Sequence, residues 1–496
     1  MSKQTGGNNA ADSQKKLRSS VKRSRPVESE EQRGPGSTSA DPSESSSNVQ
    51  STSTGPEVEP NQSDNREPSA SDDRIQSNSS VTSNSILLTK RGEIMPNIEY
   101  QEGGFFRVEI GDTLVERYDV LRYLGRGTYA TVWMVKDDID KKYLALKITK
   151  AFPGHQETAT KEVDIWLHLQ KDGQHPNIVQ YIDCCDLIKG PCVHLALQFE
   201  MMGPSLDIAM KKSNQKFHLE VVKRIIRQIL EAMKHIHQLG VIHMDLKPSN
   251  IMMAITNKNI EDFAIDQNKT HNQYYLNVTN PDSNIIVKIA DMGLSRLAET
   301  VTEPTRPACS YSPPEGFLTY KRDQSVDLWS IGCIVHQLVT GDLLIPCSKK
   351  LDDEHYTEHL ALMEDVLGPI PESPFYDDLH EKGREYFNNP VRAECDTSNA
   401  TLRILSDGAV AIKSKKDCTQ FTKLVLSFLK HDPSQRKKAA DALLHPFLNP
   451  NSGESETEKD LKNQTSSDEP GTSTSHQSTS SSRQDRNDRT SSSSKP

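Results

Sequence analysis

The distribution of aromatic residues limits where this 496-residue chain can build a folded core. Residues 1–99 contain no Phe, Tyr or Trp, and Ser, Asn, Gln, Glu, Pro and Thr dominate them. Such a segment cannot bury enough apolar surface to offset the conformational entropy that folding removes. The Ser-rich stretch after Phe447 has the same character. We therefore expect disordered tails at 1–104 and 449–496, and between them a folded region long enough for two lobes that share a cleft.

The formal net charge of -10 argues against a dedicated nucleic-acid-binding protein, because such proteins neutralise phosphates with an excess of Lys and Arg. An acidic surface favours basic partners instead. The eight cysteines lack the paired spacing of a zinc site, and no apolar run is long enough to cross a bilayer. We expect an intracellular monomer with no membrane segment and no direct contact with nucleic acid.

Two glycines lie in a turn between two apolar strands. Gly125 and Gly127 follow the strand that starts at Tyr118, and the next strand ends at Val135. Glycine lets a backbone come close to a phosphate, but a plain hairpin also explains such a turn, since Ala130 replaces the third glycine of the usual pattern.

A lysine interrupts the alternation of the next strand. In the segment 143–147, Lys147 stands where an apolar residue would continue the pattern, so its ammonium points under the glycine turn. A buried cation needs an anion, which nucleotide phosphates or Glu162, on a helix expected over 157–169, could supply. The alternative is a strand lysine that extends into solvent.

The most specific signal is a polar loop between two apolar stretches. The loop follows an amphipathic helix expected over 221–237 and reads His-Met-Asp-Leu-Lys-Pro-Ser-Asn, ending at Asn250. Phosphoryl transfer needs a carboxylate for the incoming hydroxyl, a cation near the phosphoryl group and an oxygen ligand for a metal ion. Asp245, Lys247 and Asn250 supply these three groups, and Asp291, after a later strand, can hold Mg²⁺.

These motifs, in this order, resemble the eukaryotic protein kinase family over about residues 118–448. Pro313-Pro314-Glu315 stands where the family has Ala-Pro-Glu, and Arg436 resembles the structural partner of that glutamate. The resemblance implies an α+β, two-lobed protein kinase fold, with a small β-rich N-lobe, a larger α-helical C-lobe, and ATP and Mg²⁺ as cofactors. The mostly polar insert at 254–284 is expected to be a surface loop.

The resemblance also implies roles for individual residues. Asp245, Lys247, Lys147 and Glu162 would be catalytic, while Asn250 and Asp291 would hold the metal. The hinge, which follows the strand around Gln198, would bind adenine through its backbone. The expected ATP-binding residues are Leu124, Gly125, Arg126, Gly127, Thr128, Tyr129, Ala130, Thr131, Val132, Ala145, Lys147, Phe199, Glu200 and Met202.

Within the family the chain is most similar to the SR-protein kinases of the CMGC group, which phosphorylate serines in arginine-serine repeats. The stretches 127–133, 222–228, 289–293, 340–344 and 359–368 carry this resemblance. It implies a serine/threonine kinase that acts on basic, arginine-serine-rich splicing factors. Residues 351–380 contain nine acidic side chains and no Lys or Arg, which fits an acidic docking groove, although a solvated charged face is the plainer explanation.

Departures from the family pattern leave alternatives open. Met244 replaces an Arg that a phosphorylated activation segment neutralises in most kinases, so activity should not depend on that phosphorylation. Ser312 stands where related kinases have an Arg that shapes the pocket after the phosphoacceptor, which leaves room for a proline-directed or dual-specificity CMGC-like kinase. Ala130 and Met292 are the only support for a pseudokinase scaffold.

The basic cluster at 15–25 resembles a nuclear import signal, so we expect the protein in cytoplasm and nucleus.

Overall fold

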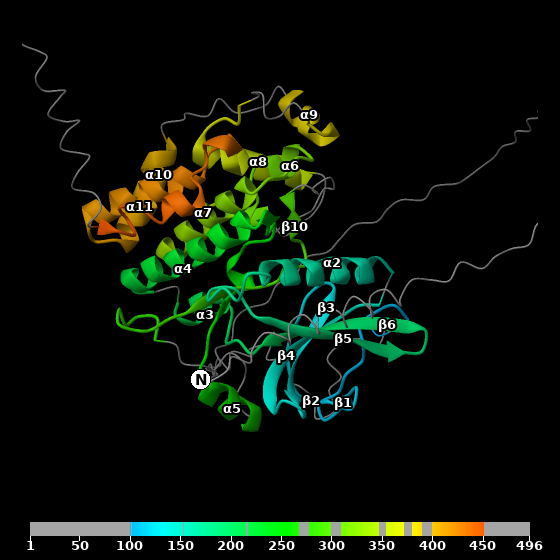
Figure 1. Cartoon of the computed structure of the whole chain (residues 1–496). Coiled ribbons are helices and arrows are strands. Elements are labelled where there is room, and N and C mark those ends of the chain that lie inside the picture. The colour runs from blue at the N-terminus through cyan, green and yellow to red at the C-terminus, as the bar shows by residue number, and fades with distance from the viewer. Residues whose placement is uncertain are drawn as a thin grey trace, which may run out of the picture. The chain divides into compact units, whose positions relative to one another are not determined.

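The computed structural model describes residues 100, 102–151, 153–214, 217–266, 277–298, 309–346, 354–371, 379–388 and 399–450. The predicted tails lie almost wholly outside these ranges and stay predictions. In the described part, an antiparallel sheet precedes a set of helices, which is the α+β arrangement that the sequence predicts (Figure 1). No helix within the described ranges is both long and apolar enough to cross a membrane.

A six-stranded sheet forms the small lobe, with the strand order β1-β2-β3-β4-β6-β5 and every neighbouring pair antiparallel. Alternate side chains point to opposite faces of a strand, and Trp133, Val135 and Leu146 are buried in the core of this lobe. Val108 and Leu114 belong to the same core, so the small lobe begins before Tyr118. The strands are β1 (Thr113–Leu114), β2 (Tyr118–Arg126), β3 (Ala130–Asp137), β4 (Lys142–Thr149), β5 (Tyr181–Lys189) and β6 (Cys192–Glu200).

Helix α2 (Pro153–Leu169) lies against the sheet and begins about one turn earlier than the sequence predicts. Its Trp166 is fully buried, and the indole meets the ring of Phe199 on β6 edge to face at 5.3 Å. Aromatic pairs in this geometry add to the stabilisation from burial alone. This contact fixes the position of α2, and with it Glu162, relative to the sheet.

The large lobe is built from helices and short strands. Its central helix α4 (Leu219–Gln238) buries Ile225, Ile229, Met233 and Ile236 at helical spacing and is followed by Gly240, whose φ of 71° suits glycine. The other helices are α3 (Leu206–Lys212), α6 (Glu315–Leu318), α7 (Ser325–Thr340), α8 (Glu354–Leu367), α9 (Glu381–Asn388), α10 (Asn399–Ala411), α11 (Lys415–Phe428) and α12 (Ala439–Ala442). The short elements are β7 (Val241–Ile242), η2 (Pro248–Asn250), β8 (Ile251–Met253), β9 (Val287–Ile289), β10 (Arg296–Leu297), η4 (Cys309–Tyr311) and η6 (Pro433–Gln435).

A buried ion pair links two distant parts of this lobe. The Arg436 guanidinium donates to Glu315 through Nη1 at 2.5 Å and Nη2 at 2.7 Å. Arg436 Nη1 also donates to the backbone oxygen of Ser325, at the start of α7. Because a two-pronged pair of this kind is strongly directional, it holds α6 in place beside α7. The sequence predicts this pair.

The insert between β8 and β9 forms a helix, so the predicted surface loop is wrong for its first part. Thr256 is the N-cap residue of helix α5 (Asn257–Ile265) and accepts a hydrogen bond from the Asn259 amide in a capping box. Residues 267–276 of the insert lie outside the described residues. Figure 1 shows α5 beside the sheet of the small lobe.

One aromatic side chain carries the contact between α5 and the sheet. Phe263 is only 1% exposed and packs with Met134 and Met201 in one apolar cluster. The Arg122 guanidinium, on β2, lies 4.4 Å from the centre of the Phe263 ring and also donates to the backbone oxygen of Asp266. A segment of the large lobe is thereby attached to the small lobe.

Candidate active site

A three-residue charge cluster joins the two lobes. Lys147 on β4 donates through Nζ to both carboxylate oxygens of Glu162, at 2.8 and 2.9 Å. The same nitrogen contacts Asp291 Oδ1 at 2.8 Å. Trp166, one turn after Glu162 on α2, donates to Glu162 Oε1 at 3.3 Å. The predicted lysine-glutamate pair is therefore formed, and Lys147 does not extend into solvent.

The charges in this cluster stabilise one another. Burial opposes the charge on Lys147, but Asp291 and Glu162 outweigh burial and hold the pKa of Lys147 above its ordinary value. Lys147 lowers the pKa of Asp291 to about 2. Burial raises the pKa of Glu162, and the nearby ammonium of Lys147 opposes that effect. Asp291 is therefore a carboxylate at any pH at which the protein would work.

The catalytic loop is held by a buried carboxylate from a distant helix. Asp327 on α7 accepts the amide of His243 at Oδ2 and the amide of Met244 at Oδ1, both at 2.9 Å. The buried His243 ring contacts the backbone oxygen of Ala290 at 3.1 Å. Met244 and Asp291 both have left-handed φ angles, 68° and 64°, which are uncommon for such residues and cluster at functional sites.

Asp245 accepts hydrogen bonds from the two other polar residues predicted from the loop. Its Oδ2 accepts from Lys247 Nζ at 2.7 Å and from Asn250 Nδ2 at 3.0 Å. Asn250 Nδ2 also donates to the backbone oxygen of Asp245 at 2.9 Å. The three polar residues predicted from the loop thus lie together, with the carboxylate held by two donors.

The oxygen atoms beside this loop suit a magnesium ion. Asn250 uses Nδ2 for its contacts with Asp245, so its Oδ1 remains for a cation, and Asp291 uses Oδ1 for Lys147, which leaves Oδ2. The two residues are neighbours, because Ala290 donates its amide to the backbone oxygen of Asn250 at 2.9 Å. The described residues contain no cluster of three or more His, Cys, Asp or Glu that could hold a metal ion. Mg²⁺ commonly takes one or two protein oxygens together with substrate phosphates, which fits this donor set.

The turn that contains Gly125 and Gly127 has open space beside both glycines. Gly127 donates its amide to the backbone oxygen of Ala130 at 2.8 Å, and Gly125 pairs with Val132 across the hairpin. A Cβ atom added to Gly125 or Gly127 would meet nothing within 4 Å. Arg126, Gly127, Thr128 and Tyr129 are exposed, whereas Thr131 is buried and its hydroxyl oxygen accepts from Trp133, leaving only its backbone for a ligand.

The predicted wall residues of the adenine pocket share one face of the sheet. Val132 pairs with Lys147, and Ala145 pairs with Phe199, so their side chains point to the same side. Phe199 is buried between Trp166 and Tyr181, with ring centres 5.3 and 5.8 Å away. Leu124 and Ala145 also pack against the cluster around Phe263, which is a contact that the sequence did not indicate.

The hinge residues play unequal roles. The Glu200 carboxylate accepts from Lys288 Nζ, at 2.7 and 2.8 Å, and from the Gln180 amide at 2.7 Å, and the Glu200 amide donates to the backbone oxygen of Gln180 at 3.1 Å, so both groups stabilise the structure. The Met202 amide makes no hydrogen bond to any residue that the structure describes. Gly203 follows directly and cannot carry a side chain, because a Cβ atom there would lie 2.5 Å from Ile255.

Comparisons with known proteins agree with this geometry. A model of the protein kinase domain matches residues 118–448. The serine/threonine-protein kinase AFC1 of Arabidopsis thaliana is 30% identical over 357 residues, which cover 70% of this chain and 73% of AFC1. The serine/threonine-protein kinase SRPK of Physarum polycephalum is 28% identical over 387 residues, which cover 71% of this chain and 90% of that protein. A crystal structure of a kinase domain superposes with a TM-score of 0.53 at 26% identity, over 69% of this chain and 98% of its own.

The match to the family model extends over more than half of the chain, and it includes the glycine turn, the Lys147–Glu162 pair, the catalytic loop and Asp291. The two-lobed fold expected from the sequence is confirmed by the same match and by the superposed crystal structure. This chain belongs to the protein kinase family and is a serine/threonine protein kinase of the CMGC group, similar to AFC1 and to SRPK of Physarum polycephalum.

Proposed function

We propose that this kinase transfers the γ-phosphoryl group of ATP to serine or threonine in basic, arginine-serine-rich proteins, among them splicing factors. The observation that carries the transfer chemistry is the placement of Asp245 between Lys247 and Asn250, beside the Lys147–Glu162–Asp291 cluster. A scaffold without activity would have no use for all of these groups together. The pseudokinase alternative therefore has little support.

Each residue has a part in this proposal. Asp245 orients the acceptor hydroxyl and takes its proton, while Lys247 steadies Asp245 and balances charge on the phosphoryl group. Lys147, fixed by Glu162, binds phosphate oxygens. Asn250 Oδ1 and Asp291 Oδ2 would hold Mg²⁺, which would neutralise charge on the phosphates when bound. The turn at 124–132 covers the phosphates, and Val132, Ala145, Phe199 and the backbone of Glu200 and Met202 surround adenine.

A cavity in the large lobe supports a basic substrate. It has a volume of about 260 Å³ and lies between the end of α7 and helix α10. Asp342 and Asp407 line it, and Arg403 is the cation in the lining. Asp407 lies 3.3 Å from the buried His336, whose pKa burial lowers, so the carboxylate is not neutralised by a charged imidazole near neutral pH. Two carboxylates in one concave site favour the guanidinium of a substrate arginine.

The acidic segment predicted for docking is only partly suited to that role. Among its described members, Glu358 and Asp365 on α8 are exposed, but Glu364 is buried and accepts the Ile370 amide at 2.9 Å. The Glu364 carboxylate therefore stabilises the fold and does not contribute to a docking surface. Asp352, Asp353, Glu372, Asp377 and Asp378 lie outside the described residues.

The substrate class is tested by labelling peptides with ATP and Mg²⁺. We expect the full chain to label an arginine-serine repeat peptide at least about tenfold faster than a lysine-serine peptide of equal length and charge, because guanidinium binds carboxylate in two-pronged geometry and ammonium does not. The measured quantity is kcat/KM. Equal rates on the two peptides would still show kinase activity but would contradict the proposed preference for arginine-serine-rich substrates.

Docking through the cavity predicts a charge-dependent KM. The change Asp407→Asn is expected to raise KM for the arginine-serine peptide about fivefold, with kcat unchanged, since the carboxylate binds substrate away from the reacting atoms. Added salt should reduce the difference, because exposed charges are screened over about 8 Å at physiological ionic strength. Asp441→Asn, at an exposed position on α12, is the matched control. An unchanged KM in Asp407→Asn would place the docking site elsewhere.

Ser312 is the observation that favours a second candidate, a proline-directed or dual-specificity kinase. A tyrosine peptide and a serine-proline peptide in the same assay separate these activities.

We also propose that the kinase works as a monomer in cytoplasm and nucleus, with the basic cluster at 15–25 as import signal. That cluster lies outside the described residues.

A further inference from the structure

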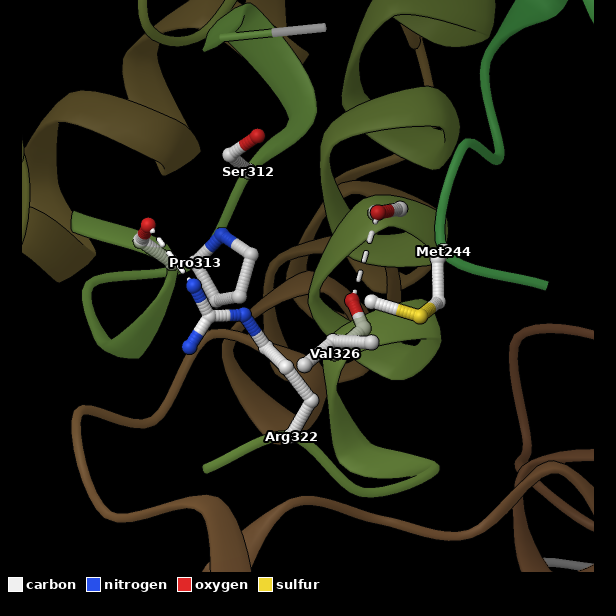
Figure 2. A pocket seen from close by; sticks show the side chains of 7 residues that line it. Met244, Ser312, Pro313, Arg322 and Val326 are labelled. Atoms are coloured by element: carbon white, nitrogen blue, oxygen red, sulfur yellow. Dashed lines mark hydrogen bonds between the residues drawn. The ribbon is translucent and has the colours of Figure 1, made fainter. Parts of the chain in front are cut away.

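Two features lie beside the active site and are not used by the proposed transfer reaction. One is a small pocket at the catalytic loop, which Figure 2 shows between Met244, Ser312 and Arg322. Its volume is about 10 Å³, close to the least room that one water molecule needs, so no side chain of a substrate enters it. The other is the segment before β1, residues 103–110, which we call the strap (blue in Figure 1). The strap bears on how the protein holds ATP.

Phe105 of the strap lies against two cations that belong to different parts of the nucleotide site. Its side chain is only 5% exposed. Lys150 Nζ lies 4.2 Å from the centre of the Phe105 ring, and the Arg126 guanidinium lies 5.9 Å from it. Arg126 ends β2 and begins the glycine turn, whereas Lys150 directly follows β4, the strand of Lys147. A cation over an aromatic face is attracted by the ring, and more strongly where water is excluded.

Backbone hydrogen bonds join the same segments. Lys150 donates its amide to the backbone oxygen of Tyr129, in the glycine turn, at 2.9 Å. Ala151, the next residue, donates its amide to the backbone oxygen of Gly104 in the strap, at 3.4 Å. Helix α2 starts two residues later. Phe105 therefore lies where the glycine turn, the end of β4 and the start of α2 meet.

Other side chains of the strap attach it to the sheet. Val108 is 1% exposed and belongs to the apolar core of the small lobe. The Phe106 ring meets the ring of His194 on β6 edge to face, with centres 5.0 Å apart, and packs against the same core. Burial alone explains these two residues. Burial at position 105 would be served by any large apolar side chain, whereas the contact with two cations needs an aromatic ring.

We propose that Phe105 is a positioning residue, which holds the glycine turn in the conformation that binds the ATP phosphates. Its ring holds Arg126 and Lys150, and through them it fixes the glycine turn relative to the end of β4, close to Lys147. The backbone amides of the turn and the Lys147 ammonium then face the same phosphates. Phe105 acts through these neighbours and not on the nucleotide itself.

This proposal rests on the use of ATP in the proposed function, and not on the arginine-serine class of substrate. It is therefore tested by nucleotide binding, which needs neither a peptide nor turnover. Failure of the full chain to label the arginine-serine peptide would count against the proposed function, but the comparison of nucleotide affinities would stand.

The measurement is the Kd of the full chain for Mg·ATP and for adenosine, by isothermal titration calorimetry. We expect Phe105→Leu, which keeps an apolar side chain, to raise the Kd for Mg·ATP about fivefold, the size of one shielded contact between a cation and a ring. The Kd for adenosine should stay within about twofold, because adenosine has no phosphate for the glycine turn to bind. A smaller folded fraction lowers the number of binding sites but not Kd, so lost folding alone does not reproduce this result.

Three further variants assign the effect to the ring. Phe105→Tyr keeps the aromatic face and should keep the Kd for Mg·ATP within about twofold of that of the unaltered chain. Phe106→Leu, the same change at the next residue, is the matched control and should leave both Kd values unchanged. Lys150→Met removes one cation and should raise the Kd for Mg·ATP, and adding Phe105→Leu to it should then have little effect, because both changes remove the same contact.

Four results would each overturn the proposal. Phe105→Leu could leave the Kd for Mg·ATP unchanged, or it could raise the Kd for adenosine by the same factor. The effects of Phe105→Leu and Lys150→Met could add in full, which would mean that the two residues act independently. The unaltered chain could fail to bind Mg·ATP at all.

Discussion

The change Asp245→Asn is expected to lower kcat about 10³-fold and to leave KM for ATP within about twofold. The amide has nearly the shape of the carboxylate but cannot accept the proton of the substrate hydroxyl. ATP contacts other groups, chiefly Lys147 and the glycine turn, so nucleotide binding should persist. The measurement is steady-state phosphotransfer to a fixed peptide, with KM for ATP determined in the same assay.

Asp138→Asn is the matched control, because Asp138 is exposed in the turn between β3 and β4 and pairs only at the surface, with Lys141 at 3.3 Å. Thermal melting separates lost chemistry from lost folding, since Lys247 and Asn250 both contact the replaced carboxylate. Activity of Asp245→Asn within tenfold of the unaltered chain would mean that Asp245 is not the base.

The local features of the site could be predicted from the sequence because each has a local pattern. Lys147 breaks a two-residue alternation in a strand, which marks it as buried and in need of an anion. The loop from His243 to Asn250 places three polar groups within eight residues between apolar stretches. Such short-range patterns depend little on the rest of the fold, and the structure brings these residues together as expected.

The support around the site could not be predicted in the same way. Asp327 holds the catalytic loop by accepting two backbone amides, and every residue except proline has such an amide, so the sequence does not show which one is bound. Glu364 is acidic and lies in an acidic segment, yet its carboxylate is turned inward to the Ile370 amide. Composition gives the charge of a segment but not the direction of each side chain.

Helix α5 shows why the insert was misread. The apolar residues that pack against the small lobe, Ile260, Phe263 and Ala264, are few, so the segment reads as polar overall. The surface that receives them is assembled from residues on β2, β3 and β4 together with Met201, and no single stretch of sequence reveals it. The helix is stabilised by a partner surface that lies mostly more than 100 residues away along the chain, so a local sequence pattern does not reveal it.

The change Phe263→Ala should therefore release α5 from the small lobe and weaken ATP binding. Removing a fully buried Phe side chain costs about 3 kcal/mol of stability, from lost burial and the cavity left behind. Because Leu124 and Ala145 pack against the Phe263 cluster and also belong to the expected adenine pocket, their loosening should raise KM for ATP several-fold, on the order of tenfold. Peptide KM should change little, since the proposed docking cavity lies at α10.

Ile265→Ala provides a control on the same helix, because Ile265 is 78% exposed and its removal alters helix composition without touching the sheet. Hydrogen exchange of α5 amides, thermal melting and KM for ATP would be compared between the two variants. If α5 is a true link between the lobes, its amides lose protection and KM for ATP rises only in Phe263→Ala. If both variants behave like the unaltered chain, the contact between Phe263 and the small lobe contributes neither to stability nor to the nucleotide site. The insert would then be a surface segment that does not link the two lobes.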